Sequence, residues 1–268
     1  AVCSIIFDSN YCLVMDAFWI FRTALLWLGL TCASLASPPV SAQELTRAAL
    51  LQEIWTELAK VDALISQGKR DESYEVLEAI SWKSYNNENL IQGTRELYLP
   101  NLAMARYYRH KKDYAESERF AAAVIAGMAD DGWTTDPARI EALAILGLVL
   151  RMQNDHRQAE VVLRSAVDIS EGRTDVALHH RNALYHLSFV AIQNKAKDAL
   201  EVLDRTVALF DAANLKSDLY RARLVNAGLQ YERTQKADRI QLVKKAREFQ
   251  VFLTSANVDP ASEIVKYL

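Results

Sequence analysis

The sequence predicts an all-α fold built from repeated antiparallel helix pairs. Three observations lead to this prediction. Apolar residues make up 51% of the 268 residues, with only 8 Gly and 5 Pro, so the chain can bury a core but has few turn formers. Large apolar residues recur at helical spacing around small ones. This pattern also returns at intervals of about 40 residues, which is typical of a solenoid.

The composition argues against several classes of function. The formal net charge is −3 and no long run has one sign, so nothing in the charge favours nucleic acid as a partner. The cysteines are Cys3, Cys12 and Cys32, which leaves none in the body for a disulfide, a thiolate metal site or a nucleophile. A body without cysteine suits an oxidising compartment, because no thiol can mispair there.

Residues 15–42 have the pattern of an export segment. Arg22 precedes an apolar stretch, and small residues lead to Ala42, after which we predict cleavage. Residues 1–14 would lie upstream of the natural start and have no fold of their own. The alternative is an uncleaved anchor over residues 18–36, which would be the chain's one contact with a membrane. The sequence contains no Asn-x-Ser/Thr acceptor, so we favour a bacterial periplasm or secretion.

Residues 52–82 are expected to form the first helix pair. A turn at Gly68 separates two stretches with apolar residues at helical spacing, and Ser73 supplies the small residue of the second helix. The residues that match the pattern are Val61, Leu64, Gly68, Ser73, Leu77 and Ile80.

The strongest repeat pattern lies in residues 101–167. Gly147 stands among large residues of the stretch LAILGLVLRMQNDHRQAEVVLRSA, and Ala159 holds the matching place after the turn. Ala105 and Ser117 repeat these positions in NLAMARYYRHKKDYAESERFAAAVI. Small residues at these places let two helices approach closely. Both stretches resemble tetratricopeptide repeats, and the second is similar to the long repeats of kinesin light chains.

Two further pairs follow with weaker patterns. The fourth has Ser188 in its first helix and a turn that is shorter by about one residue. The fifth has Leu224, Ala227, Gly228 and Tyr231, followed by a poorly patterned helix from about Ala237. The second-helix positions Ser73, Ser117, Ala159 and Ala199 are 44, 42 and 40 residues apart. The resemblance therefore implies a right-handed superhelical solenoid of about five long repeats over residues 43–258, with a cap helix over residues 259–268.

Proline and glycine residues predict several helix boundaries. Pro137 suits the first turn of a helix, and Gly172 is expected to end one. Pro100 either begins the first helix of the second pair or kinks a helix that runs from Asn89, and we favour a kink or a short break. Asp259-Pro260 is expected to open the final short helix.

A search for chemical motifs predicts no catalytic residue, no metal site and no cofactor. Gly-rich phosphate loops and nucleophile elbows are absent from the sequence. His179 and His186 share a helix face with Asp175, but a zinc site needs three or four converging ligands, so a polar helix surface is the better interpretation. An enzyme with an unrecognised site is kept as the alternative of a different class.

The resemblance places a partner-binding groove on the first helix of each pair. Apolar residues alternate there with arginines, which suits a protein or peptide segment that has acidic and apolar residues. Tetratricopeptide domains that bind the C-terminal carboxylate of a partner use a set of Lys, Asn and Arg residues. Asp62 stands where the first repeat would supply an Asn of this set, which argues against a partner bound by its C-terminal carboxylate. We predict an exported, non-catalytic scaffold or adaptor, and the alternative is a sensor ectodomain or a fragment of a larger envelope protein. The predicted groove residues are Leu102, Arg106, Arg109, His110, Leu148, Arg151, Tyr185, Phe189, Leu229 and Arg233.

Overall fold

The computed structural model describes residues 42–213, 219–235, 244–248 and 251. These ranges contain helices and short turns, and no strand occurs within them. The chain divides into two compact units, one ending at Gln92 and the other beginning at Gly93. None of the helices in the described ranges has the length and apolar character needed to cross a bilayer. The export segment up to residue 41 and the cap at residues 259–268 lie outside the described residues.

The first unit contains one long helix pair and a short third helix. Its helices are α2 (Ala42–Ser66), α3 (Arg70–Asn86) and α4 (Glu88–Ile91). Ile54 and Val61 of α2 pack with Leu77 and Ile80 of α3, and none of these four side chains is more than 2% exposed. The predicted first helix pair is therefore present.

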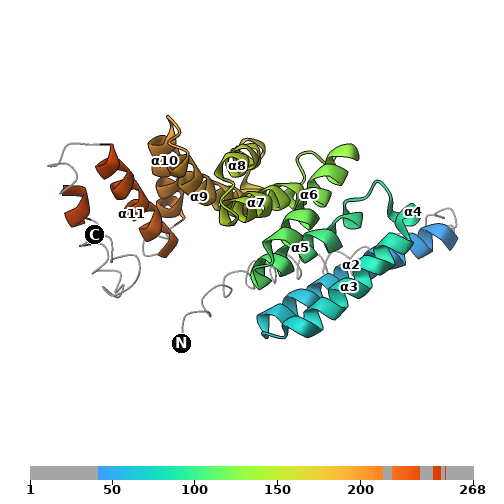
Figure 1. Cartoon of the computed structure of the whole chain (residues 1–268). Coiled ribbons are helices and arrows are strands. Elements are labelled where there is room, and N and C mark those ends of the chain that lie inside the picture. Colours follow the sequence, from blue (N-terminus) through green and yellow to red (C-terminus); the bar gives the residue numbers. More distant parts are fainter. Residues whose placement is uncertain (1–41, 214–218, 236–243, 249–250, 252–268) are drawn as a thin grey trace, which may run out of the picture. The chain divides into compact units, whose positions relative to one another are not determined.

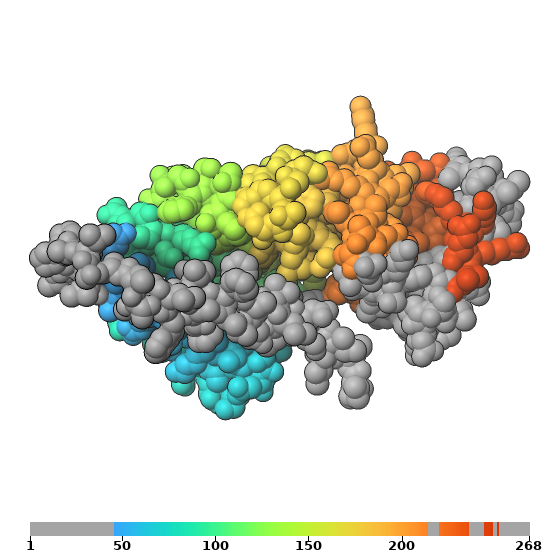
Figure 2. Space-filling view, turned by 180° about the vertical axis from the view of Figure 1, so that it is seen from behind, coloured from blue at the N-terminus to red at the C-terminus, as the bar shows by residue number. Residues whose placement is uncertain are grey.

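The second unit is a series of helix pairs, each packed on the next (Figure 1). The space-filling view in Figure 2 shows the same progression, with the yellow segment next to the orange one. We call the first helices of the pairs A helices and the second ones B helices. The A helices are α5 (Leu99–Lys111), α7 (Pro137–Met152), α9 (Ala177–Gln193) and α11 (Leu219–Thr234), and the B helices are α6 (Tyr114–Asp130), α8 (His156–Ser170) and α10 (Ala199–Ala212). Two short 3-10 helices, η1 (Arg95–Leu97) and η2 (Thr174–Val176), precede α5 and α9.

One turn geometry recurs between the two helices of each complete pair. Gly68, Lys112, Asn154 and Lys195 all have a positive φ, between 54° and 76°, in the left-handed region. The amide that follows each of them donates to a carbonyl five residues earlier, as in Asp155 N to Leu150 O at 2.9 Å. This arrangement caps the carbonyls at the end of a helix and reverses the chain. The repeat seen in the sequence is thus also a repeat of backbone conformation.

Small residues bring the two helices of a pair together, as the sequence predicts. The Ser117 hydroxyl donates to the Ala105 carbonyl at 2.8 Å across α5 and α6. A Cβ atom at Gly147 would lie 2.4 Å from Cγ of Leu163, so only glycine fits at this contact between α7 and α8. The second-helix positions Ser73, Ser117, Ala159 and Ala199 are all buried, with at most 1% exposure.

Most of the predicted helix boundaries are confirmed. Helix α7 begins at Pro137, and the Asp136 carboxylate accepts the amide proton of Ala138 at 2.8 Å. Helix α8 ends at Ser170, just before Gly172. No kink occurs at Pro100, but the predicted short break is present between α4, which ends at Ile91, and α5, which begins at Leu99. Pro100 lies in the first turn of α5, where a missing N–H costs no helical hydrogen bond.

Candidate partner-binding surface

The A helices of the second unit carry most of its positive charge. Consecutive A helices pack side by side, so their outward residues form one surface. They hold nine Arg and Lys residues but only two Glu, whereas the B helices α6, α8 and α10 hold four Arg and eight acidic residues. The nine are Arg106, Arg109, Lys111, Arg139, Arg151, Arg181, Arg221, Arg223 and Arg233, and the two are Glu141 and Glu232.

An ion pair between A helices neutralises part of this charge. Arg106 of α5 donates from Nε and Nη2 to the two carboxylate oxygens of Glu141 on α7, at 2.5 Å each. His179 Nε2 of α9 lies 3.9 Å from Glu141 Oε2. Burial would raise the pKa of Glu141, but Arg106 and His179 outweigh it and lower this pKa to about 2. Glu141 is therefore ionised at neutral pH and links three successive A helices.

An aromatic cluster lies further along the same surface. Tyr185 and Phe189 of α9 have ring centroids 5.1 Å apart, and Tyr220 of α11 lies 5.1 Å from Tyr185 on another side. Two arginines cover this cluster. The guanidinium of Arg151 lies 5.1 Å from the Phe189 ring centroid, and that of Arg223 lies 5.8 Å from the Tyr220 ring centroid.

These two arginines differ from Arg106 in their charge environment. Among the described residues, no carboxylate lies within ion-pair distance of Arg151 or Arg223. Burial lowers the pKa of Arg151, and the nearby charge of Arg223 lowers it further, while Tyr185 acts in the opposite direction. A guanidinium that is half-buried on an aromatic ring has already lost part of its hydration. It can therefore bind a carboxylate strongly.

His186 adds a buried polar atom beside this cluster. Its ring packs edge to face against Tyr185, with 5.0 Å between the centroids. Its Nδ1 is buried and has no hydrogen-bond partner among the described residues. Burial, together with the charges of Arg151 and Arg109, holds the pKa of His186 well below its usual value. The imidazole is therefore neutral at pH 7.

The structure distributes the predicted groove residues over three environments. Leu102, Tyr185 and Leu229 are buried, at 2%, 7% and 8% exposure, so they support the surface from below and offer little contact area of their own. For Leu102 the reason is that it packs in the core between α5, α6 and α7. The remaining predicted residues are accessible: Arg106, Arg109, Leu148, Arg151 and Phe189 are partly buried, and His110 and Arg233 are exposed.

The prediction missed four residues of this surface. They are Glu141, His186, Tyr220 and Arg223. Tyr220 and Arg223 lie in the first turns of α11, whereas the predicted groove residues of that helix, Leu229 and Arg233, follow Gly228. Counting backward by one or two turns finds Arg223 and Glu141, which precede Gly228 and Gly147 by five and six residues.

The structure places the three histidines of α9 in different environments, and His179 is 25% exposed beside Glu141. His180 is 8% exposed, and its Nδ1 lies 2.8 Å from the Ser170 hydroxyl, while His186 is partly buried and its Nδ1 atom is buried. His180 is buried because α9 packs against α8, which carries Ser170. In the described part of the chain, no three His, Cys, Asp or Glu side chains converge in a way that could hold a metal ion.

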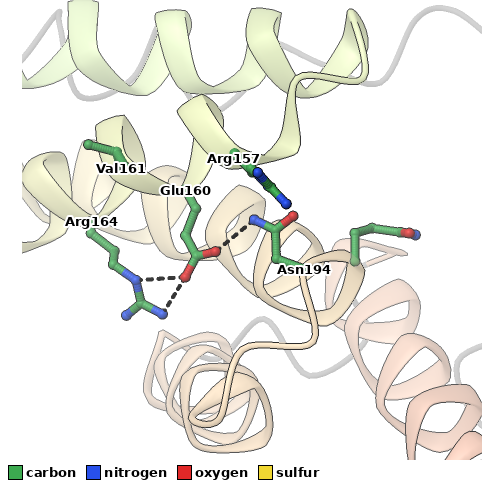
Figure 3. Close-up of a pocket in the computed structure, with 6 residues that line it drawn as sticks. Arg157, Glu160, Val161, Arg164 and Asn194 are labelled. Carbon is green, nitrogen blue, oxygen red and sulfur yellow. Dashed lines mark hydrogen bonds and ion pairs between the residues drawn. The ribbon is translucent and has the colours of Figure 1, made fainter.

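A pocket of about 520 Å³ lies at α8 and the end of α9 (Figure 3). Its polar groups already bind one another: Glu160 accepts from Arg164 at 2.7 Å and from the Asn194 amide at 2.7 Å. Arg164 also donates to both oxygens of Asp198 at 2.8 Å. These bonds join neighbouring helix pairs, so we assign the pocket a structural role.

Comparison with solved structures identifies the architecture. The chain is similar to two crystal structures of the putative kinesin light chain nearly identical TPR-like repeats of Podosopora anserina, one of them a form with a single substitution. The TM-scores are 0.60 and 0.59, with 13% identity, 78% of this chain covered, and 98% and 99% of the other chains. This chain has a tetratricopeptide-like repeat fold. No family model matches it, and none of the curated proteins matches it either.

The tetratricopeptide-like assignment confirms the predicted all-α solenoid and its resemblance to kinesin light chain repeats. At 13% identity this likeness concerns the fold. The groove residues, the partner and the cellular compartment stay predictions.

Proposed function

We propose that the A-helix surface of the second unit binds an acidic, partly apolar segment of another protein, and that the chain acts as a non-catalytic adaptor exported to the cell envelope. The observation behind this proposal is the pair of arginines, Arg151 and Arg223, which cover an aromatic cluster and have no carboxylate partner among the described residues. A carboxylate of the partner would complete this charge pairing, while its apolar residues would contact Phe189 and Tyr220.

Arg106 has a different role in this proposal. Because Glu141 already occupies its guanidinium, Arg106 contributes little free charge, and its reversal would disturb the packing of α5 on α7. Arg151 and Arg223 are therefore the residues to change.

The test is partner capture from an envelope extract by the full chain, with captured proteins identified by crosslinking mass spectrometry. We expect the double variant Arg151→Glu, Arg223→Glu to lose at least 90% of the partner that the wild type captures, with the same helical circular dichroism. The control is Arg157→Glu, an exposed arginine on the B helix α8, which should capture normally. Equal capture by the double variant and the wild type would contradict the groove proposal.

A further inference from the structure

Helix α3 of the first unit exposes two large aromatic side chains. Trp82 is 60% exposed and Tyr85 is 69% exposed, and their rings meet edge to face with 6.1 Å between centroids. The opposite face of α3, with Leu77 and Ile80, is buried against α2. Exposed apolar area of this size is unfavourable in water, so an aromatic pair held on the outside of a helix suggests a contact surface.

Two carboxylates share this exposed face. Glu75 and Glu78 are exposed, and the spacing of 75, 78, 82 and 85 places all four side chains along one side of the helix. At 1.5 Å per residue the row spans about 15 Å. No ion pair of Glu75 or Glu78 occurs among the described residues. We call Glu75, Glu78, Trp82 and Tyr85 the acidic aromatic stripe.

The second unit offers a surface of complementary chemistry. Arg151, Phe189, Tyr220 and Arg223, which we call the basic aromatic surface, combine two partly buried rings with two arginines that have no carboxylate partner in the described ranges. The stripe supplies two exposed rings and two carboxylates that pair with no cation in the part of the chain that the structure describes. The two surfaces are therefore opposite in charge, and both present aromatic rings that can pack together.

We infer that the acidic aromatic stripe of one copy docks on the basic aromatic surface of a second copy of this chain. This inference rests on the proposed function, because it uses the same binding surface and names an occupant for it. The two surfaces are different, so the contact is heterologous and leaves each copy with one surface open. The wild type should therefore form assemblies that grow with concentration.

Complementation between two defective variants tests the inference. Trp82→Ser with Tyr85→Ser removes the stripe, and Arg151→Glu with Arg223→Glu removes the basic surface. Analytical ultracentrifugation of the full chains should show each variant alone at the mass of one chain, 30.2 kDa. An equimolar mixture should form a complex of twice that mass and nothing larger, because it holds only one pair of intact surfaces. Salt at 1 M, where the Debye length is about 3 Å, should weaken this complex at least tenfold.

Matched controls separate the contact from general surface effects. Val161→Ser removes an exposed apolar side chain that is 71% exposed on α8, and Arg157→Glu reverses an exposed arginine on the same helix. Both control variants should assemble as the wild type does. A wild type that stays monomeric, variants that assemble unchanged, or a mixture without the two-chain complex would each overturn the inference.

The capture experiment distinguishes this inference from the function on which it rests. In one outcome the wild type never self-associates, and the Trp82→Ser, Tyr85→Ser variant captures the envelope partner normally. This outcome would reject docking of a second copy and leave the proposed function standing. Loss of self-association in the Arg151, Arg223 variant without any loss of partner capture would reject the proposed function alone.

Discussion

Among single residues, Glu141 shows how one carboxylate organises a charged surface. It accepts two hydrogen bonds from Arg106 and lies close to His179, so three A helices share one negative charge. The same carboxylate explains why Arg106 and Arg151 have different roles although both are arginines on A helices. Arg106 is bound within the unit, whereas Arg151 lies over Phe189.

The substitution Glu141→Gln should destabilise the protein in a pH-dependent way. The folded state lowers the pKa of Glu141 from 4.5 to about 2, so its contribution to stability is present above pH 4.5 and is lost as the pH falls toward 2. We expect a free energy of unfolding lower by about 2–3 kcal/mol at pH 7, and a difference that shrinks through this window.

Urea unfolding followed by circular dichroism at several pH values measures this difference. The substitution Asp175→Asn serves as the control, since Arg173 is the ion-pair partner of Asp175 among the described residues and Asp175 is exposed. A difference between Glu141→Gln and wild type that stays constant from pH 7 to pH 2 would show that the carboxylate charge is not the cause.

The two helices of a pair approach closely where a glycine leaves no side chain between them. Gly147 of α7 faces Leu163 of α8, which is fully buried, while Gly228 of α11 faces Leu203 of α10. A Cβ atom at Gly147 would lie 2.4 Å from Cγ of Leu163, close to the α8 backbone. At Gly228 the nearest atom is Cδ2 of Leu203, at 3.1 Å, which is the end of a flexible side chain.

Alanine at these two glycines should therefore have opposite effects. Gly147→Ala should lower the free energy of unfolding by about 1–2 kcal/mol, because overpacking outweighs the gain of about 1 kcal/mol in helix propensity. Gly228→Ala is the matched case in which Leu203 can move aside, so it should be neutral or stabilising by up to about 1 kcal/mol. Urea midpoints for both variants measure this, and equal effects would refute the packing explanation.

Over the second unit as a whole, charge is separated between two sets of helices. The A helices are basic and the B helices are acidic, although the net charge of the chain is only −3. The overall composition hides this separation, because the two sets alternate along the sequence. A partner with acidic residues would therefore be directed to the A-helix surface.

The export proposal is tested on the full chain. When the reading frame from Met15 is expressed in a bacterial host, the mature protein should be recovered from the periplasm or the medium with Gln43 as its first residue. Cell fractionation and N-terminal sequencing measure this. A chain with Arg22→Glu, which lacks the positive start of the segment, should be retained inside the cell. Recovery of the unprocessed wild-type chain from the membrane fraction would support the uncleaved anchor instead.

Much of the fold could be predicted because its determinants are local. Gly147 and Ala159 mark a close helix contact through their size alone, and Pro137 marks a helix start through its missing N–H. The place of Pro100 could not be predicted in this way, because the same missing N–H permits either a start or a kink, and only the preceding 3-10 turn at Arg95–Leu97 decides between them. For the candidate surface, the sequence indicated Arg151 and Phe189 but not their contact.

Local patterns alone were enough to establish that this chain is a series of helix pairs with a long repeat, because helix periodicity, small contact residues and left-handed turns act within about 40 residues. Which arginines lack a carboxylate partner among the described residues emerged only from the packed helices. Arg106 meets Glu141 across 35 residues of sequence, and Arg151 of α7 and Arg223 of α11 lie over rings of one aromatic cluster only after the pairs have stacked. Such pairings depend on how helices pack, and packing is a property of the folded chain that no local pattern records.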